Sequence, residues 1–584
     1  MNNTLYKIPL TLGITGHRDL REEDKEKLCN AIRHIFQFLC LHYPHTPLKL
    51  LSPLADGADR LVAQVALEEK VQLAVPLPMP RDLYQIDFQT PDSKAEFDDF
   101  WEKAQDKFEL SLLEGNTPEK IKSHGKNRTK QYAFAGAYIA RHSHILIALW
   151  DGLDLEKSAG TSQVVQFKLT GDMKDLPDEY KPQQGHLDIP DTGPVCYVKT
   201  GRKKGLPADC VGEIQVLLPN AEPQNDLKNL LSDDLAALNC FNQNVEKYVT
   251  DAKLQKSIEK GQAYLLPDRL WQRLSPAFPP MLGAYSTANT LAQYFHSRLK
   301  LFTVLLLWIV ASMVSLYGWY SSVGENNLSA LLGYLILFLG AWGVLLFVKR
   351  QRYESHQLDY RALAEGLRVQ IFWHLGGLTH SVADHYLRKQ RGELSWIRGA
   401  IRALNIYDWV KNTESLDVVY RHWFNNQRDW LSNSAQQNQD KAKKYDKWIK
   451  YLFTSGIVFI FAMLVLQVMG GLQSQPLLHN VLILLIALVP TAGVLLHHYA
   501  EKMAFDEHAK QYGRMAKLFA IGSRALDDII KRQQTVKNDP EKSNAYQKEA
   551  EKLLFDLGKE ALQENADWVL LHRKKPFELP KSEV

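Results

Sequence analysis

The sequence predicts an α/β domain over residues 1–215 and an α-helical membrane domain with four transmembrane helices in two duplicated hairpins. Short apolar segments alternate with helical stretches in the first 215 residues, which is typical of a sheet with helices on its faces. Four later segments are apolar over about 20 residues each, enough to cross a hydrocarbon core as a helix. They occur as two closely spaced pairs, and each pair precedes the same short helical motif.

Five short apolar segments, each bounded by turn or helix-starting residues, are the predicted strands of the sheet. They are Ile8–Ile14, Leu48–Leu51, Val71–Val75, His144–Leu149 and Pro194–Val198. Three of these strands end in loops that combine glycine with polar residues. Those three strand–helix junctions contain the candidate ligand-binding residues.

The first strand runs directly into a turn and an acidic helix start. The candidate residues here are Gly13, Thr15, Gly16, His17 and Arg18. Glycine lets the backbone approach a ligand closely, and the following helix presents free N–H groups and a partial positive charge to a phosphate. Arg18 can add a bidentate contact to the same group.

The second strand leads into a similar turn before the helix 61–69. Its candidate residues are Ala55, Asp56, Gly57, Asp59 and Arg60. An acidic residue at this place in an α/β sheet suits the hydroxyl groups of a ribose. The second junction thus complements a phosphate site at the first.

The third junction follows the strand 144–149. Its candidate residues are Trp150, Asp151 and Gly152 at the strand end, and Gly160, Thr161 and Ser162 at the start of the next helix. Glycines after strands are commonly simple turn residues, so one junction alone is weak evidence. Three junctions at the carboxyl ends of strands in one sheet converge on one crevice, and together they predict a nucleotide pocket.

A charged insert over residues 82–128 has two interpretations. Its aromatic residues can form a lid over a base or ribose, or they can pack in the core, which is the commoner fate of such residues. They are Tyr84, Phe88, Phe97, Phe100 and Trp101.

The four predicted spans are Leu301–Tyr320, Leu328–Val348, Tyr451–Gly470 and Leu477–Leu496, and none contains Asp, Glu, Lys or Arg. Buried core helices are the alternative, but four such segments in close pairs favour membrane spans. Lys and Arg flank each pair, whereas the joining loops carry little charge. The loops are therefore expected to face outward and both chain ends the cytosol.

The two pairs are predicted copies of one unit. The segment His356–Ala364 reads HQLDYRALA and the segment His508–Ala516 reads HAKQYGRMA, an offset of 152 residues. The same offset brings Leu301 onto Phe453, near the start of the matching apolar run.

Composition excludes some functions. A net charge of +4 is too small for nucleic acid as the main partner, and five scattered cysteines without ligand spacing predict no metal site. The segment Met1–Pro9 has no apolar core of a signal peptide, so the internal spans must direct insertion. The predicted division is an α/β domain 1–215, a helical connector 216–296, hairpins 297–350 and 451–498, and cytosolic helical regions 351–450 and 499–584.

The three junctions, in order, resemble the SLOG group of Rossmann-like domains over about residues 5–205. The matching motifs are Gly13-Ile-Thr-Gly16-His-Arg18, Leu54-Ala-Asp-Gly57-Ala-Asp-Arg60, and Leu149-Trp-Asp-Gly152 with Gly160-Thr161. The group includes nucleotide-sensing modules of bacterial immunity proteins, the LOG phosphoribohydrolases and the amino-terminal regions of TRPM-type channels. The resemblance implies a nucleotide-derived signalling ligand and no other cofactor, and the TRPM likeness favours relatives of ADP-ribose.

One departure from that group bears on catalysis. LOG enzymes carry a glutamate three residues after the Gly-Thr of their glycine-rich loop, and Val164 stands at that position here. Valine cannot stabilise or activate groups at an anomeric carbon, so binding without catalysis is expected and no catalytic residue is assigned. The alternative is a membrane-anchored hydrolase of NAD or nucleotides, in which Asp56, Asp59 or Asp151 acts as the acid or base.

The first hairpin with the following Tyr360–Arg368 resembles the SLATT type of two-span effector that accompanies such sensors. The two resemblances imply a membrane effector of bacterial anti-phage defence, in which a second messenger triggers pore formation or membrane disruption and growth arrest. The expected partners are that messenger, a lipid bilayer, a separately encoded enzyme that makes the messenger, and further copies of the chain in a tetramer or another even assembly. The expected location is the inner (cytoplasmic) membrane, with several passes and both termini in the cytosol.

Overall fold

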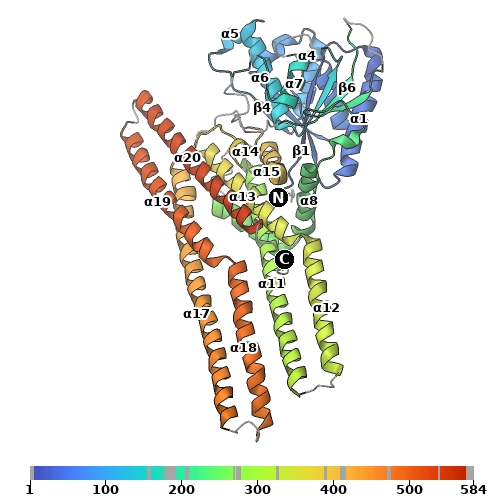
Figure 1. Ribbon diagram of the computed structural model, residues 1–584. Helices are drawn as coiled ribbons and strands as arrows, with labels where there is room; N and C mark the ends of the chain where they lie inside the picture. The colour runs from blue at the N-terminus through green and yellow to red at the C-terminus, as the bar shows by residue number, and fades with distance from the viewer. Residues whose placement is uncertain are drawn as a thin grey trace. The chain divides into compact units, whose positions relative to one another are not determined.

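Figure 1 shows the computed structural model, which describes residues 6–153, 160–174, 176–177, 192–203, 210–267, 270, 278–323, 328–386, 391–407, 416–469, 475–536 and 539–573. The loop predicted inside each hairpin lies largely outside these ranges, as does the loop 154–159 of the third junction.

A seven-stranded sheet forms the centre of the α/β domain in the described part of the chain. The strands are β1 (Leu10–Gly16), β2 (Leu48–Leu51), β3 (Gln72–Leu77), β4 (Asp106–Glu109), β5 (Ile145–Trp150), β6 (Val195–Lys199) and β7 (Ile214–Leu217). Their order is β4-β3-β2-β1-β5-β6-β7; β1 to β6 are parallel and β7 is antiparallel to β6. The predicted fold class is therefore confirmed, and the five predicted strands correspond to β1, β2, β3, β5 and β6.

Helices cover both faces of this sheet. A Cβ at Gly13 would lie 2.8 Å from Ile139 Cγ2 in helix α6 (Lys126–His142), whereas a Cβ at Gly16 would lie 2.4 Å from Ala58 Cβ in helix α2 (Ala58–Glu68). Residues an odd number apart in a strand point to opposite faces, so α6 and α2 lie on opposite sides of β1. The described helices within residues 6–177 are η1 (Glu22–Asp24), α1 (Lys25–His42), α2 (Ala58–Glu68), α3 (Arg81–Tyr84), η2 (Gln85–Asp87), α4 (Pro91–Lys103), α5 (Pro118–Lys122), α6 (Lys126–His142) and α7 (Thr161–Thr170).

The chain divides into two compact units that are not simple successive segments. Unit 1 comprises residues 1–288 and 363–414, and unit 2 comprises residues 289–362 and 415–584. Unit 1 thus includes helices that follow the first hairpin in the sequence. Besides the sheet, unit 1 holds η4 (Leu227–Leu230), α8 (Asp233–Tyr248), α9 (Ala252–Leu265), α14 (Val382–His385), α15 (Arg391–Leu404), the beginning of α11 (Phe278–Val323) and the end of α13 (Tyr353–Leu375).

Specific polar contacts attach the returning segment to the sheet domain. The Tyr138 hydroxyl of α6 donates to the Ile406 carbonyl, and the Tyr407 hydroxyl donates to Asp106 Oδ1 at 2.9 Å. Arg141, also in α6, pairs with Asp384. The predicted domain boundary at residue 215 falls within β7, and the compact unit extends beyond it.

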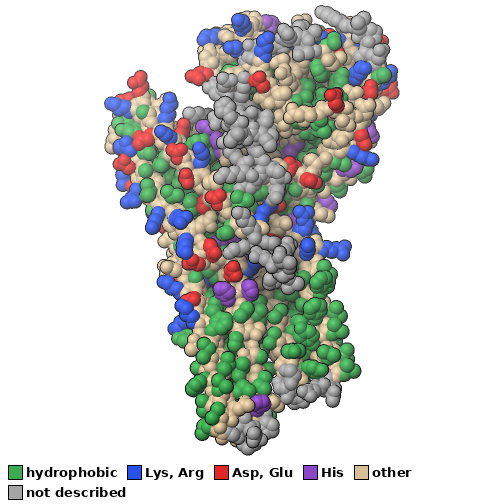
Figure 2. Space-filling model, in the orientation of Figure 1, with side chains coloured by type: hydrophobic (Ala, Val, Ile, Leu, Met, Phe, Trp, Pro, Cys, Tyr) green, Lys and Arg blue, Asp and Glu red, His purple; other side chains and the backbone are tan. Residues whose placement is uncertain are grey.

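Among the described residues, four helices are long and apolar enough to cross a membrane, and their apolar parts belong to unit 2. The hairpins are α11 with α12 (Leu328–Gln351) and α17 (Asn426–Val468) with α18 (Pro476–Lys502). Figure 2 shows hydrophobic side chains gathered over the lower parts of these helices, and Trp308, Ile336 and Phe461 are each about two-thirds exposed. The other helices of this unit, in the described part of the chain, are the beginning of α13, α16 (Leu416–Val419), the π-helix Tyr420–Asn425, α19 (Phe505–Thr535) and α20 (Pro540–Arg573).

The duplication is visible in the backbone as well as in the sequence. Arg352 and Ala504, which are 152 residues apart, both adopt a left-handed conformation with φ of 50° and separate each second span from the helix after it. His356 stacks on Tyr360 and His508 on Tyr512, with ring centroids 5.5 Å apart in both copies. The same break and the same stacked pair therefore recur after each hairpin.

Candidate functional site

The strand order places the candidate site between β1 and β5. The chain moves outward from β1 through β2, β3 and β4 on one side and continues through β5 and β6 on the other. In such sheets the loops diverge where the order reverses, and ligands bind beside the carboxyl ends of the strands there. Gly16 pairs with Leu149 at these ends, so the first and third predicted junctions are neighbours.

His17 and Asp151 form the centre of this edge. The Asp151 amide donates to His17 Nε2 at 3.1 Å, and the same nitrogen lies 3.1 Å from Asp151 Oδ1. Burial lowers the pKa of His17, while the neighbouring Asp151 carboxylate opposes that shift. In the neutral ring Nε2 accepts from the Asp151 amide; in the charged ring Nε2–H faces the Asp151 carboxylate instead.

Arg202 approaches the same pair from the end of β6. Its Nε donates to Asp19 Oδ1 at 3.0 Å, and its Nη1 lies 3.9 Å from Asp151 Oδ2. The bridge between Leu20 and Arg202 holds the two loops together. Arg202 was not among the predicted site residues, although Gly201 precedes it and the last predicted strand ends only four residues earlier, which is the signal that could have found it.

Arg18 lies on the other side of His17 and is half exposed. Its Nη1 is 3.7 Å from Asp87 Oδ2, and its guanidinium lies 5.6 Å from the centre of the Tyr132 ring. Asp87 is buried, accepts from Arg128 at 2.7 Å and also accepts from the Tyr132 hydroxyl. These contacts orient Arg18 while leaving its guanidinium accessible to an anion. We call His17, Arg18, Tyr132, Asp151 and Arg202 the switch-point cluster.

The second junction contacts the backbone of the first junction. Gly57 has φ of 87°, and a Cβ there would lie 2.4 Å from the Arg18 carbonyl oxygen. The Ala58 amide at the start of α2 donates to the His17 carbonyl at 3.0 Å. Only glycine at position 57 therefore permits this close approach of the two loops.

Asp59 is buried in this junction. Its Oδ2 accepts from the Ala55 amide at 3.3 Å, and burial raises the pKa of Asp59 to about 7, an effect that the positive charge of Arg18 opposes. A carboxyl group with a pKa near neutrality is suited to general acid–base chemistry.

Asp56 and Arg60 are engaged mainly with each other and with α4. Arg60 Nη1 lies 2.7 Å from Asp56 Oδ1 and 2.8 Å from Glu96 Oε2, and the Ser93 hydroxyl donates to Asp56 at 2.6 Å. Arg60 is buried and its guanidinium covers the Phe88 ring. These two predicted binding residues thus anchor α4 to the second junction.

The third junction is only partly near the switch-point cluster. Trp150 stacks edge-on against Tyr197, and Gly152 has φ of 80° with its α-carbon facing the Tyr197 hydroxyl. Gly160 caps α7, and Thr161 and Ser162 form its first turn after the loop outside the described ranges. Val164 is buried against Gly136 of α6 instead of facing the strand ends.

The structure also places Gly13 and Thr15 of the first junction and the aromatic residues of the insert. Gly13 lies inside β1 beneath α6, three residues before the strand end, whereas Thr15 is buried next to Gly16. The aromatic residues Tyr84, Phe88, Phe97 and Phe100 of the insert are buried, as the core-packing interpretation expects. Across the residues that the structure describes, no group of three or more His, Cys, Asp or Glu side chains is placed to hold a metal ion.

Comparison of the sequence with protein-family models and with curated proteins found no match to either.

Proposed function

We propose that the switch-point cluster binds a nucleotide-derived second messenger and that binding changes the state of the membrane helices in the same chain. The observation that carries this proposal is Arg18, half exposed yet oriented by Tyr132 and Asp87 beside the His17–Asp151 pair. Guanidinium groups at this place suit phosphate oxygens, and carboxylates suit ribose hydroxyls. Arg202 on the other side of Asp151 supports a ligand with two phosphates.

The proposed ligand is of the ADP-ribose or cyclic ADP-ribose type, or a cyclic oligonucleotide. All of these combine phosphates with riboses, which matches the mixture of arginine and carboxylate side chains at the β1/β5 edge. The sequence resemblance to SLOG sensors supports the same class of ligand.

The proposed role is that of a membrane effector in bacterial anti-phage defence. Two helical hairpins without charges in their predicted spans support a pore or a membrane lesion that forms on assembly of several copies. In this proposal a separate enzyme makes the messenger, the protein lies in the inner membrane with both ends in the cytosol, and its opening arrests growth. Coupling of about 1–3 kcal/mol per site is sufficient when several copies act together.

A membrane-anchored hydrolase of NAD or nucleotides is the second candidate. The pKa of about 7 for Asp59, close to Arg18, favours it because such a group can donate or accept a proton near neutral pH. The buried Val164 and the bond from the Ala55 amide to Asp59 favour binding alone.

The test uses the full chain in lipid nanodiscs, titrated calorimetrically with ADP-ribose, cyclic ADP-ribose isomers and cyclic dinucleotides. Arg18→Ala is expected to raise the Kd by roughly tenfold or more, the effect of losing a hydrogen bond to a charged group. Arg33→Ala is the matched control, because Arg33 lies on α1 and pairs with Glu68. Dye release from liposomes then checks whether the bound ligand opens the membrane.

Three results separate the candidates. Binding without turnover, followed by ligand-dependent leakage, supports the effector. Consumption of NAD or nucleotide that is lost in Asp59→Asn makes the hydrolase the correct function. Equal affinity of the Arg18→Ala and Arg33→Ala proteins for every ligand refutes the binding site.

A further inference from the structure

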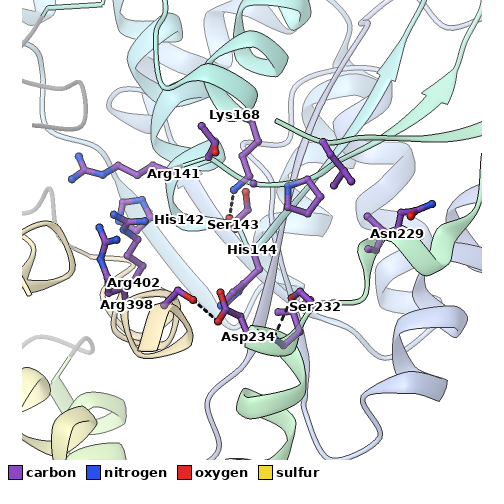
Figure 3. Close-up of a pocket in the computed structure, with 18 residues that line it drawn as sticks. Arg141, His142, Ser143, His144, Lys168, Asn229, Ser232, Asp234, Arg398 and Arg402 are labelled. Carbon is purple, nitrogen blue, oxygen red and sulfur yellow. Dashed lines mark hydrogen bonds between the residues drawn. The ribbon is translucent and has the colours of Figure 1, made fainter. Parts of the chain in front are cut away.

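Some positive side chains of unit 1 are used by the fold. Around the polar cavity shown in Figure 3, Lys168 Nζ donates to the carbonyl groups of Ala140 and Ser143, at 3.0 and 2.5 Å. Arg398, which also lines this cavity, donates to the Ala383 carbonyl at 2.6 Å. Cations held in this way fix loops and helices in place. A group of lysines in unit 2 lies on the surface instead, beside a predicted membrane span.

Helix α17 carries five lysines within ten residues, directly before its span. They are Lys441, Lys443, Lys444, Lys447 and Lys450, and all five are exposed. The helix continues without a break from this segment into the apolar residues of the span, so the lysines keep a fixed distance from the membrane. At about 1.5 Å of rise per residue, the whole segment lies within roughly 15 Å of Tyr451, where the span begins.

Two aromatic residues mark the level of the membrane surface on the same helix. Trp448 and Tyr451 have exposed fractions of 54% and 57%. Exposed Trp and Tyr side chains of membrane helices lie where the hydrocarbon meets the headgroups. Lys444, Lys447, Trp448 and Tyr451 are three or four residues apart and therefore share one face of α17, which we call the basic face. In Figure 2, Lys and Arg side chains border the apolar surface on the side of α17.

The lysines of the basic face are not used for ion pairs within the described part of the chain. Lys447 Nζ lies 5.6 Å from the centre of the Tyr451 ring, and the ion pair in this segment joins Lys450 to Asp446 instead, at 2.7 Å. Asp440, one turn farther from the span, accepts from Gln436 at 3.0 Å. The charges of Lys444 and Lys447 are therefore available to an external anion.

The first copy of the duplicated unit lacks this face. The offset of 152 residues brings Ala292, Phe295 and Leu299 of α11 to the lysine and tyrosine positions of the basic face. These three residues are buried, with exposed fractions of 4%, 1% and 7%. The helix before a span thus forms without surface lysines at these positions. The basic face is a property of the second hairpin and not a requirement of the repeated unit.

We propose that the basic face of α17 binds the headgroups of anionic phospholipids at the surface of the membrane that its span crosses. A lysine beside a span favours anionic over neutral lipid by about fivefold when it lies near the surface. The two aromatic rings place the lysines at the depth of the phosphate groups. The site is separate from the switch-point cluster and does not depend on messenger binding.

The test places the full chain in phosphatidylcholine nanodiscs that also contain a lipid with a photoreactive headgroup, either phosphatidylglycerol or phosphatidylcholine. Mass spectrometry measures the yield of cross-links on residues 441–451. The yield with the anionic lipid is expected to exceed the yield with the zwitterionic lipid by about fivefold or more. This preference should disappear between about 0.1 M and about 1 M salt, because the screening length falls from about 10 Å to about 3 Å.

The double variant Lys444→Gln, Lys447→Gln is expected to lose most of the preference at low salt. Glutamine is a good helix former, and both positions are exposed, so α17 should remain intact. The double variant Lys548→Gln, Lys552→Gln is the matched control, because it removes the same charge from exposed positions of α20 outside the basic face. It should keep the full preference.

Equal cross-linking of the two lipids to the unchanged protein at low salt overturns the proposal. An equal preference for the anionic lipid in the two double variants also overturns it, because the preference then arises elsewhere. If the Lys444→Gln, Lys447→Gln protein does not fold, the salt series of the unchanged protein decides, and a preference that persists at about 1 M salt refutes binding by the lysines.

Discussion

Asp59 shows how one buried carboxyl group links stability to pH. Its folded pKa of about 7 exceeds the ordinary value of 3.8, so between these values the folded state binds more protons than the unfolded state. Stability therefore falls as the pH rises from about 4 to 7, and it changes little beyond that window. Below pH 4 the carboxyl group is protonated in both the folded and the unfolded state, so it gives stability no further dependence on pH.

Asp59→Asn is predicted to raise stability at pH 8 by on the order of 4 kcal/mol, because asparagine stays neutral at every pH. The temperature midpoint of unfolding of the full chain, measured at pH 4 and pH 8, checks this. The unfolding midpoints of the Asp59→Asn protein and of the unchanged protein should be equal at pH 4, and that of the Asp59→Asn protein should be higher at pH 8. Asp82 is exposed, so the Asp82→Asn protein should show no such dependence on pH. If the midpoints of the Asp59→Asn protein and the unchanged protein differ by the same amount at pH 4 and at pH 8, the pKa of Asp59 is not raised.

At the residue scale the sequence located some site residues and not others. Gly16, His17, Arg18 and Asp151 follow strands directly, so their convergence could be expected from strand order alone. The contacts that orient Arg18 depend on tertiary packing, because Asp87 comes from the insert, Tyr132 comes from α6, and Arg128 acts by pairing with Asp87. Asp56 and Arg60 carry the right chemistry for a ligand, yet the fold uses them to hold α4.

At the scale of elements, α17 and α18 are in close contact where Gly456 of α17 faces Pro490 of α18. A Cβ at Gly456 would lie 2.9 Å from Pro490 Cγ, and Gly456 is buried. Pro490 stands inside α18, which continues through it from Pro476 to Lys502. The glycine opposite lets the proline ring approach the neighbouring helix.

Gly456→Leu is predicted to separate the second hairpin and to lower the midpoint of thermal unfolding in nanodiscs, with a cost of about 1–3 kcal/mol from overpacking. Gly340→Leu is the matched control in α12, because nothing lies within 4 Å of the added Cβ in the described part of the chain. Equal midpoints for the two variants would show that the Gly456–Pro490 contact does not stabilise the hairpin.

The edge strands show the limit of prediction for elements. β4 has the sequence DKFE, in which only Phe108 is buried, and β7 is four residues long. Such short strands lack the alternation that identifies a half-buried strand. The long buried strands were predicted from two different patterns. β5 is almost continuously apolar, as expected of a strand that is covered on both faces, whereas in β1 the apolar residues Leu10, Leu12 and Ile14 alternate with Thr and Gly.

At the scale of the whole molecule, the composition of unit 1 predicts which fragments fold. Asn242 of α8 accepts from the Ile8 amide and donates to the Ile8 carbonyl, both at 2.9 Å, and Asn239 accepts from the His45 amide at 3.0 Å. A fragment that ends at residue 215 lacks Asn239 and Asn242, so the backbone groups of Ile8 and His45 lose these hydrogen bonds. No sequence pattern marked this dependence, because it arises from contacts between distant segments.

The fragment 1–215 is therefore predicted to aggregate or to show rapid amide hydrogen exchange in β1. A fragment that joins 1–288 to 363–414 through a short glycine–serine linker should be soluble, with β1 protected. Hydrogen exchange measured by mass spectrometry compares the two directly. Equal protection of β1 in both fragments would mean that the sheet does not need the other elements of unit 1.

The division of unit 1 into 1–288 and 363–414 also sets the order of events during synthesis. The ribosome must complete the first hairpin before it makes Asp384, Arg398 or Ile406, so the sheet domain receives its last elements only after that hairpin has left the exit tunnel. Completion of unit 1 is then tied to prior synthesis of the first apolar hairpin. A nascent chain that stops within the first hairpin therefore carries a sheet without the segment 363–414 that completes its compact unit.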